Sequence, residues 1–130
     1  PIKAVLYGLS SAPDTDWVVR LSDVHPDGYS RPLADGIIRA RYRDSFREPT
    51  LLTPGTIYKY EVDMWAIGNA FLPGHRIRVT VTSSCFPKYD RNMNTGASNN
   101  ATEAVGQSAI NTVFHDGMRP SHILLPLIDA

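Results

Sequence analysis

The sequence predicts an all-β fold in which two antiparallel sheets pack face to face as a sandwich or jelly roll. Three observations lead to this prediction. Roughly seven to nine short segments are rich in apolar and β-branched residues, and several alternate apolar with polar positions, as half-buried strands do. Turn residues such as Pro, Gly and Asp separate these segments, and no long helical pattern lies between them. The length of 130 residues suits one domain with its own core.

The first half of the chain contains three expected strands. Residues 4–9 and 17–24 are apolar segments, and the second of them leads into the tetrapeptide His25-Pro26-Asp27-Gly28. This tetrapeptide is a turn signal, because Pro suits the second position of a turn and Gly the last. Residues 37–43 alternate apolar with polar positions over most of their length, so we expect a third, half-buried strand there.

The second half continues the pattern of strands and turns. The expected strands are residues 57–64, 77–82, 108–115 and 122–127. The segment 77–82 is the clearest of them, because Ile77, Val79 and Val81 fall on one face of an alternating, β-branched strand. Residues 65–72 read as a further extended piece, and the small polar residues of 90–107 predict a long loop. Loops of this length in a compact domain are usually functional or packed against another part of the protein.

The charge balance excludes two classes of partner. Thirteen basic and thirteen acidic residues cancel, so nothing steers the chain to nucleic acid or to an anionic membrane. A small basic cluster is interleaved with acidic residues, and its alternate spacing predicts one polar face of a strand; its members are Arg39, Arg41, Arg43 and Arg47. No apolar run approaches the roughly 20 residues of a membrane span. The single cysteine, Cys85, excludes an internal disulfide but does not fix the compartment.

The residues offer no convincing catalytic centre. A hydrolase of the α/β type needs its serine in a G-x-S-x-G elbow, and the chain has no such motif. His115, Asp116 and Ser121 are the best internal triad candidates, but closeness in sequence says little about triad geometry. Cys85 at the end of an alternating strand reads more simply as a small buried hydrophobe than as a nucleophile. We therefore predict no catalytic residue and no cofactor.

The sequence contains only partial patterns for a metal site or a sugar site. Asp90, Asn92 and Asn94 begin like a calcium loop, but glycine falls at position seven and Ala101 stands where a bidentate Glu is required. Asp14 and Asp16 are oxygen donors on a turn, where Asp commonly bonds its own backbone. The four histidines lack a spacing that puts two of them on one local face, so no zinc site is predicted; they are His25, His75, His115 and His122. Aromatic residues such as Trp17 and Trp65 leave open a carbohydrate- or ligand-binding β-sandwich module.

A series of short motifs carries a family resemblance. In chain order the motifs are Ser10-Ser11-Ala12-Pro13-Asp14-Thr15-Asp16-Trp17, Leu21-Ser22-Asp23-Val24-His25-Pro26-Asp27-Gly28, Gly36-Ile37-Ile38-Arg39-Ala40-Arg41-Tyr42-Arg43, Pro73-Gly74-His75-Arg76-Ile77-Arg78, Phe86-Pro87, Asp90-Arg91-Asn92, Asn94-Thr95-Gly96 and Pro120-Ser121-His122-Ile123-Leu124-Leu125-Pro126. Together they resemble the C-terminal, non-catalytic domain of the X-Pro dipeptidyl-peptidase and cocaine-esterase family of serine hydrolases. The order and spacing of the motifs, more than any one of them, make the resemblance specific.

The resemblance implies a galactose-binding-domain-like jelly roll that follows an α/β-hydrolase catalytic domain in the same polypeptide. In the family the catalytic Ser, Asp and His lie in that preceding domain, so none is transferred to this chain. The parent would be an X-Pro dipeptidyl-peptidase, an acyl esterase or an α-amino-acid ester hydrolase. The chain starts inside an expected strand without an initiator Met, and we expect residues 1–130 to be one accessory domain of a longer hydrolase.

The resemblance also implies a scaffold role. The domain is expected to pack on the α/β-hydrolase catalytic domain, to shape the surroundings of the active site and to contribute to contacts in a homo-oligomer. We expect polar residues of three loops to lie at the domain interface or to fix loops by hydrogen bonds, since planar guanidinium groups suit bidentate pairing across a polar interface. These residues are Asp14, Asp16, His75, Arg76, Tyr89, Asp90, Arg91 and Asn92.

Overall fold

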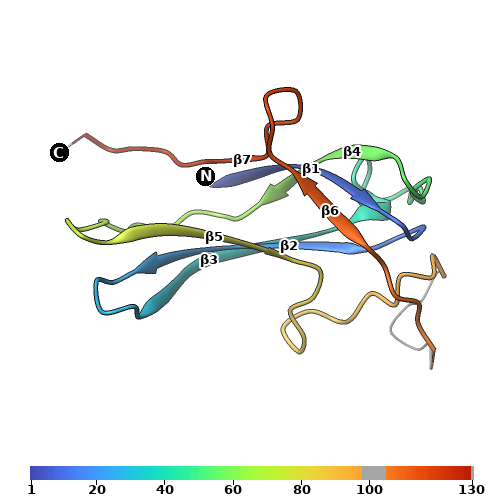
Figure 1. Ribbon diagram of the computed structural model, residues 1–130, viewed down its shortest axis with the longest axis horizontal. Coiled ribbons are helices and arrows are strands. Elements are labelled where there is room, and N and C mark those ends of the chain that lie inside the picture. Colours follow the sequence, from blue (N-terminus) through green and yellow to red (C-terminus); the bar gives the residue numbers. More distant parts are fainter. Residues whose placement is uncertain (98–104, 130) are drawn as a thin grey trace.

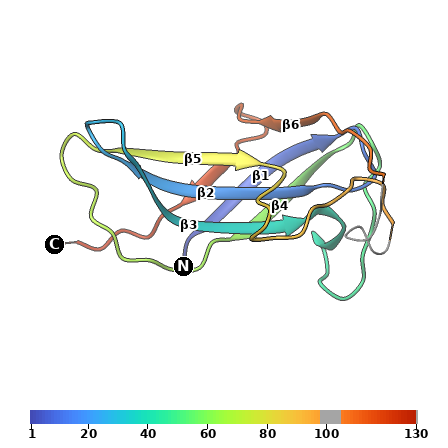
Figure 2. The same cartoon turned by 90° about the horizontal axis from the view of Figure 1, so that it is seen from below.

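The computed structural model describes residues 1–97 and 105–129, which form two antiparallel sheets stacked as a sandwich (Figures 1 and 2). One sheet has β1 at its centre, with β4 along one edge and both β6 and β7 along the other; its strands are β1 (Lys3–Ser10), β4 (Ile57–Asp63), β6 (Asn111–Phe114) and β7 (His122–Leu124). The other sheet has the order β3-β2-β5; its strands are β2 (Asp16–Val24), β3 (Ser30–Arg39) and β5 (Arg76–Thr82). The predicted all-β, two-sheet antiparallel sandwich is therefore confirmed.

Most expected strands are present, with some differences at their ends. The predictions for residues 4–9, 17–24, 57–64 and 77–82 match β1, β2, β4 and β5. β6 and β7 are shorter than predicted and follow one another along the same edge of β1, and a bridge between His115 and Pro120 closes the loop between them. Residues 65–72 form no strand. Of the predicted loop 90–107, the described residues are non-strand, and residues 98–104 lie outside the described part of the chain. Among the described residues, no helix is long and apolar enough to cross a membrane.

The prediction of a strand over residues 37–43 is wrong at both ends. β3 begins at Ser30 and ends at Arg39, and a short 3₁₀ helix, η1 (Ala40–Tyr42), follows it. The predicted polar face of alternating arginines does not exist either, because Arg41 is buried. The physical reason is Asp14, whose carboxylate accepts hydrogen bonds from the backbone N and from Nε of Arg41. This tertiary contact outweighs the local alternation and turns the chain inward.

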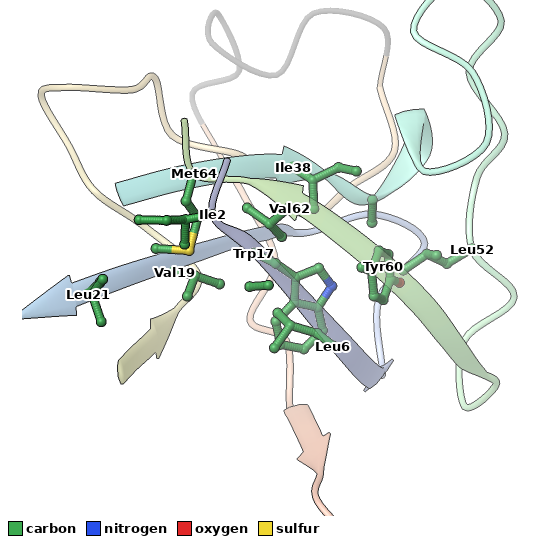
Figure 3. Packing of buried hydrophobic residues seen from close by; sticks show 12 residues of the cluster. Ile2, Leu6, Trp17, Val19, Leu21, Ile38, Leu52, Tyr60, Val62 and Met64 are labelled. Atoms are coloured by element: carbon green, nitrogen blue, oxygen red, sulfur yellow. The ribbon is translucent and has the colours of Figure 1, made fainter. Parts of the chain in front are cut away.

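The core lies between the sheets around Trp17 and Tyr60, whose ring centroids are 5.6 Å apart (Figure 3). Trp17 lies on the face of β2 that points to the other sheet, and it packs across β1 where Gly8 leaves room for its ring. A Cβ atom on Gly8 would lie 2.7 Å from the Trp17 ring, closer than any side chain tolerates. The other buried members of the cluster are Ile2, Ala4, Leu6, Val19, Leu21, Ile38, Ala40, Leu52, Val62 and Met64. Each fully buried large side chain contributes about 1.5–3 kcal/mol to stability.

The two long sides of the sandwich differ. On one side β3 meets β4 closely, since a Cβ atom on Gly36 would lie 2.3 Å from the carbonyl oxygen of Asp63. On the other side β5 leaves part of its core-facing row exposed. Val79 pairs with the core residue Leu21 across the β2–β5 ladder, so both share the core-facing side, yet Val79 is 41% exposed. The sandwich is thus closed along β3 and β4 and open along β5.

Candidate functional site

Two buried carboxylates fix the loop between β1 and β2. Asp14 is fully buried, and its Oδ2 accepts a hydrogen bond from Arg41 Nε at 2.8 Å. Asp16 accepts two parallel hydrogen bonds from Arg39, from Nε at 2.9 Å and from Nη2 at 3.1 Å. These bonds raise the pKa of Arg39 above its ordinary value. Each buried carboxylate thus has a guanidinium partner, which costs less free energy than burying a carboxylate without one.

The loop after β5 joins the same network. The side-chain amide nitrogen of Asn92 donates to Asp14 Oδ2 at 2.8 Å and to Asp16 Oδ1 at 2.9 Å. Asp90 Oδ1 accepts from Arg39 Nη2 at 3.3 Å. Four of the eight predicted site residues, Asp14, Asp16, Asp90 and Asn92, therefore come together with two arginines and tie this loop to the ends of β2 and β3.

The network uses oxygens that the sequence pattern offered as calcium ligands, and Ala101 of that pattern lies outside the described residues. Asn92 turns its nitrogen to the two aspartates, while its Oδ1 accepts a hydrogen bond from the backbone N of Asn94. Asp14 and Asp16 face guanidinium groups. Oxygens of Asp14, Asp16, Asp90 and Asn92 are therefore engaged by donors of the protein itself.

The other four predicted residues lie apart from this network. His75 contacts Asp23 at the other end of β2, with Nδ1 2.7 Å from Oδ1. Tyr89 Oη lies 3.5 Å from Asp35 Oδ1. Arg91 is exposed and its guanidinium lies over the ring of Phe86, 5.6 Å from the centroid. Arg76 is exposed at the start of β5 and forms no ion pair with any residue of the described part of the chain.

The alternative catalytic candidates are engaged elsewhere. Ser121 Oγ accepts a hydrogen bond from the backbone N of Tyr7 at 2.9 Å. Asp116 accepts from Arg119 Nη2 at 2.9 Å, and this bond lowers the pKa of Asp116. Within residues 1–97 and 105–129 no hydrogen bond joins His115 to either side chain. Cys85 is half-buried, with Sγ 3.7 Å from Arg20 Nη2.

The two tryptophans do not form a shared stacking platform. Trp17 is 2% exposed in the core, whereas Trp65 is 73% exposed beyond the end of β4. Trp65 also has a positive φ of 64°. Of the two tryptophans, only Trp65 presents its ring to a ligand in solvent.

A second polar cluster consists of Asp23, His25 and His75, and local spacing in the sequence gave no sign of it. The β2–β5 ladder pairs Val24 with Arg76, so His25 comes opposite His75, and their ring centroids are 4.4 Å apart. One potential ligand atom from each of the three residues lies within 4.8 Å of the other two. Burial raises the pKa of Asp23, but the hydrogen bonds from His75 and Asn69 outweigh it and leave this pKa lowered. The strand register, which the sequence does not reveal, assembles this cluster.

An apolar groove runs along the open side of the sandwich. We call it the β5 groove and define it by Ile77, Val79 and Val81 of β5 on one side and Val113, Ile123 and Leu125 on the other. Its larger part has a volume of about 260 Å³ and reaches down to Ala4 and Leu6 of β1. A smaller part of about 120 Å³ continues toward Ile2, Phe71 and Leu127. Exposed apolar surface of this extent commonly marks a contact with another protein segment.

Comparison with known proteins shows the family to which this sandwich is similar. Residues 1–124 match the family described as the X-Pro dipeptidyl-peptidase C-terminal non-catalytic domain. The chain is 50% identical over 129 residues to the cocaine esterase of Rhodococcus sp. (strain MB1 Bresler), covering 98% of this chain and 22% of the esterase.

Solved structures agree with the family match. An aminopeptidase from the marine sediment archaeon Thaumarchaeota archaeon superposes with a TM-score of 0.89 at 35% identity, and an α-amino acid ester hydrolase with a TM-score of 0.83 at 35% identity. Each match covers 94% of this chain and 22% of the other. The chain thus spans about a fifth of the length of these relatives. The resemblance seen in the sequence motifs is confirmed, and the chain belongs to the C-terminal non-catalytic domains of the X-Pro dipeptidyl-peptidase and cocaine-esterase family of serine hydrolases.

Proposed function

We propose that this chain is the accessory domain of a longer serine hydrolase and that it packs on an α/β-hydrolase catalytic domain of the same polypeptide. The catalytic Ser, Asp and His then lie in that other domain, and the reaction is the hydrolysis of an ester or peptide-type bond. The support is the family, together with relatives named as a cocaine esterase, an α-amino acid ester hydrolase and an aminopeptidase, each about five times longer than the matched region.

The observation that carries the proposal is the uncovered, core-facing side of β5. Ile77 is 53% exposed and Val79 is 41% exposed on a face that elsewhere in the same sheet is buried. Each 100 Å² of apolar surface left in water forgoes about 2.5 kcal/mol of stabilisation. Covering this row of β5 side chains would therefore stabilise the parent protein.

The occupant that we propose is an amphipathic β-strand from the remainder of the parent polypeptide. Such a strand would lie over β5 beside β6 and β7, whose outer edges pair with no described strand. Its alternate apolar side chains would fill the β5 groove, and its backbone would pair with the free edge of the β1 sheet. With this strand in place the sandwich becomes a galactose-binding-domain-like jelly roll.

The polar residues divide into two roles in this proposal. Asp14, Asp16, Asp90 and Asn92 fix the loop after β5 through the hydrogen bonds described above. Arg76 and Arg91 are exposed, and a guanidinium suits bidentate pairing with a carboxylate of the catalytic domain or of a second subunit. A rigid loop that carries an arginine is well suited to shape the surroundings of an active site.

The docking proposal is tested in the full-length hydrolase with two substitutions on adjacent residues of β5. Val79→Glu places a charge on the groove side, whereas Thr80→Glu places the same charge on the opposite, exposed side. We expect Val79→Glu to lower the melting temperature by about 5 °C or more and to reduce turnover, and Thr80→Glu to behave like the wild type. Equal behaviour of the two variants would refute docking through the groove.

The non-catalytic role is tested separately by labelling with a fluorophosphonate probe, which reacts with activated serines. We expect no label on the 130-residue chain and stoichiometric label on the full-length hydrolase. Stoichiometric labelling of the chain alone would place a nucleophile in the sandwich, and Ser121 would then be the first residue to replace.

A further inference from the structure

We propose that Asp23, His25 and His75 form a binding site for a divalent transition-metal ion, with Zn²⁺ as the preferred occupant. The proposal does not depend on the docking of a catalytic domain, since all three ligands come from this chain. Two imidazoles and one carboxylate form a recurrent zinc ligand set, which leaves one position for water or a further ligand.

The distances suit such a site after small side-chain rotations. The potential ligand atoms lie within 4.8 Å of one another, and His75 Nδ1 and Asp23 Oδ1 are 2.7 Å apart. Tetrahedral zinc with bonds of about 2.0–2.1 Å holds its ligand atoms about 3.3 Å apart. The ion would therefore replace the proton that now joins His75 to Asp23, and it would draw His25 closer.

His25 is the residue that distinguishes a metal site from a simple hydrogen-bonded pair. Its ring centroid lies 4.4 Å from that of His75, with the two planes tilted by 41°, and it contacts Tyr29 edge-to-face at 5.1 Å. Neither of its ring nitrogens makes a hydrogen bond to another residue in the described part of the chain. Both nitrogens are therefore open to a ligand, in a half-buried position beside a carboxylate.

Asp23 has the support that metal-binding carboxylates usually have. It is 3% exposed at the end of the core-facing row of β2, and Asn69 Nδ2 lies 3.4 Å from its Oδ2. This contact orients the carboxylate from the segment between β4 and β5, so that Oδ1 faces the histidines. Outer contacts of this kind hold metal ligands in place, and their loss commonly weakens binding by about 10–100-fold.

The position of the cluster predicts a structural effect of the ion. Asp23 is the last residue but one of β2, His25 begins the turn to β3, and His75 follows the Pro73-Gly74 turn that leads into β5. A bound ion would therefore clamp the β2–β3 turn to the start of β5. It would stabilise the end of the sheet at which the β5 groove begins.

The test uses the tag-free 130-residue chain, freed of metal with a chelator and then titrated with Zn²⁺ against a chromophoric zinc indicator. His25→Ala is the decisive variant, because removal of a half-buried ring without hydrogen bonds should leave the fold intact, which circular dichroism verifies. His115→Ala removes an exposed histidine outside the cluster and is the matched control. Cobalt(II) absorption in the visible range reports the coordination geometry independently.

We expect the wild type and His115→Ala to bind one equivalent of Zn²⁺, and His25→Ala to bind at least about tenfold more weakly. Saturating Zn²⁺ should raise the melting temperature of the wild type and the control by about 5 °C or more and leave His25→Ala nearly unchanged. The intense bands of four-coordinate cobalt should be absent in His25→Ala. Absence of binding to the wild type, or equal binding to the wild type and His25→Ala, overturns the proposal.

Discussion

Asp14 is the residue on which the loops at one end of the sandwich converge. Its oxygens accept hydrogen bonds from the backbone and Nε of Arg41 and from the amide of Asn92, and the carboxylate has no exposed surface. An ion pair taken out of water adds little net stability relative to an apolar pair of the same shape. Removal of one partner is costly, however, because it leaves an uncompensated charge in the protein.

Arg41→Ala is therefore expected to lower the free energy of unfolding by about 3–5 kcal/mol. Chemical denaturation followed by tryptophan fluorescence measures this change, since Trp17 lies in the core. Arg31→Ala is the control, because Arg31 is exposed on β3, and we expect its effect to stay within about 0.5 kcal/mol. A loss below about 1 kcal/mol in Arg41→Ala would mean that Asp14 finds other compensation.

The contacts of Asp35 with two basic side chains lead us to expect that the stability of the protein depends on pH. Burial raises its pKa, but Lys88 and Arg20 outweigh burial and leave it below the ordinary 3.8. A carboxylate with a lowered folded-state pKa stabilises the protein above its unfolded-state pKa, and this contribution is lost as the pH falls through the folded-state value. We expect Asp35→Asn to flatten the loss of stability below about pH 4.

The measurement is chemical denaturation at a series of pH values from neutral to acid. Asp129→Asn serves as the control, since Asp129 is exposed and forms no ion pair within the described part of the chain. If Asp35→Asn and Asp129→Asn show the same acid dependence as the wild type, Asp35 does not contribute to it.

At the level of the elements, alternation in the sequence correctly predicted the strands that contribute the core. It failed where a distant side chain intervened. Arg41 continues an alternating pattern, yet it lies in η1 and not in β3. The reason is that Asp14, in the loop between β1 and β2, binds its side chain. The burial of Arg41 has no local signal strong enough to predict it. Residues 65–72, expected as a further extended piece, form no strand; β4 ends at Asp63, whose side chain accepts a hydrogen bond from the backbone N of Trp65.

Gly36 decides how closely β3 and β4 approach. We expect Gly36→Ala to lower the free energy of unfolding by at least about 2 kcal/mol, because its Cβ would meet the backbone oxygen of Asp63 at 2.3 Å, and backbone cannot rotate away. Gly68→Ala is the control, since no atom lies within 4 Å of a Cβ at that position. Denaturation midpoints of the two variants compare these effects, and equal midpoints would show that the two strands separate at little cost.

At the scale of the whole molecule, the sandwich is closed on one long side and open on the other. The closed side is held by β3 against β4, and the open side exposes the core-facing row of β5. This asymmetry is the physical basis for the proposed docking of further polypeptide. The same β2–β5 ladder that presents the β5 groove also brings His25 opposite His75. The docking surface and the proposed metal site are thus two consequences of one strand register.

The sequence by itself determined the fold class, the positions of the main strands and the family, because alternation and turn residues act locally and the family motifs can be read in order. It also indicated Asp14, Asp16, Asp90 and Asn92 as notable loop residues. Only the tertiary structure decided that these four share one network, that Arg41 is buried and that Asp23, His25 and His75 meet. The reason is that each of these arrangements depends on contacts between segments far apart in the chain, and strand register and burial set such contacts.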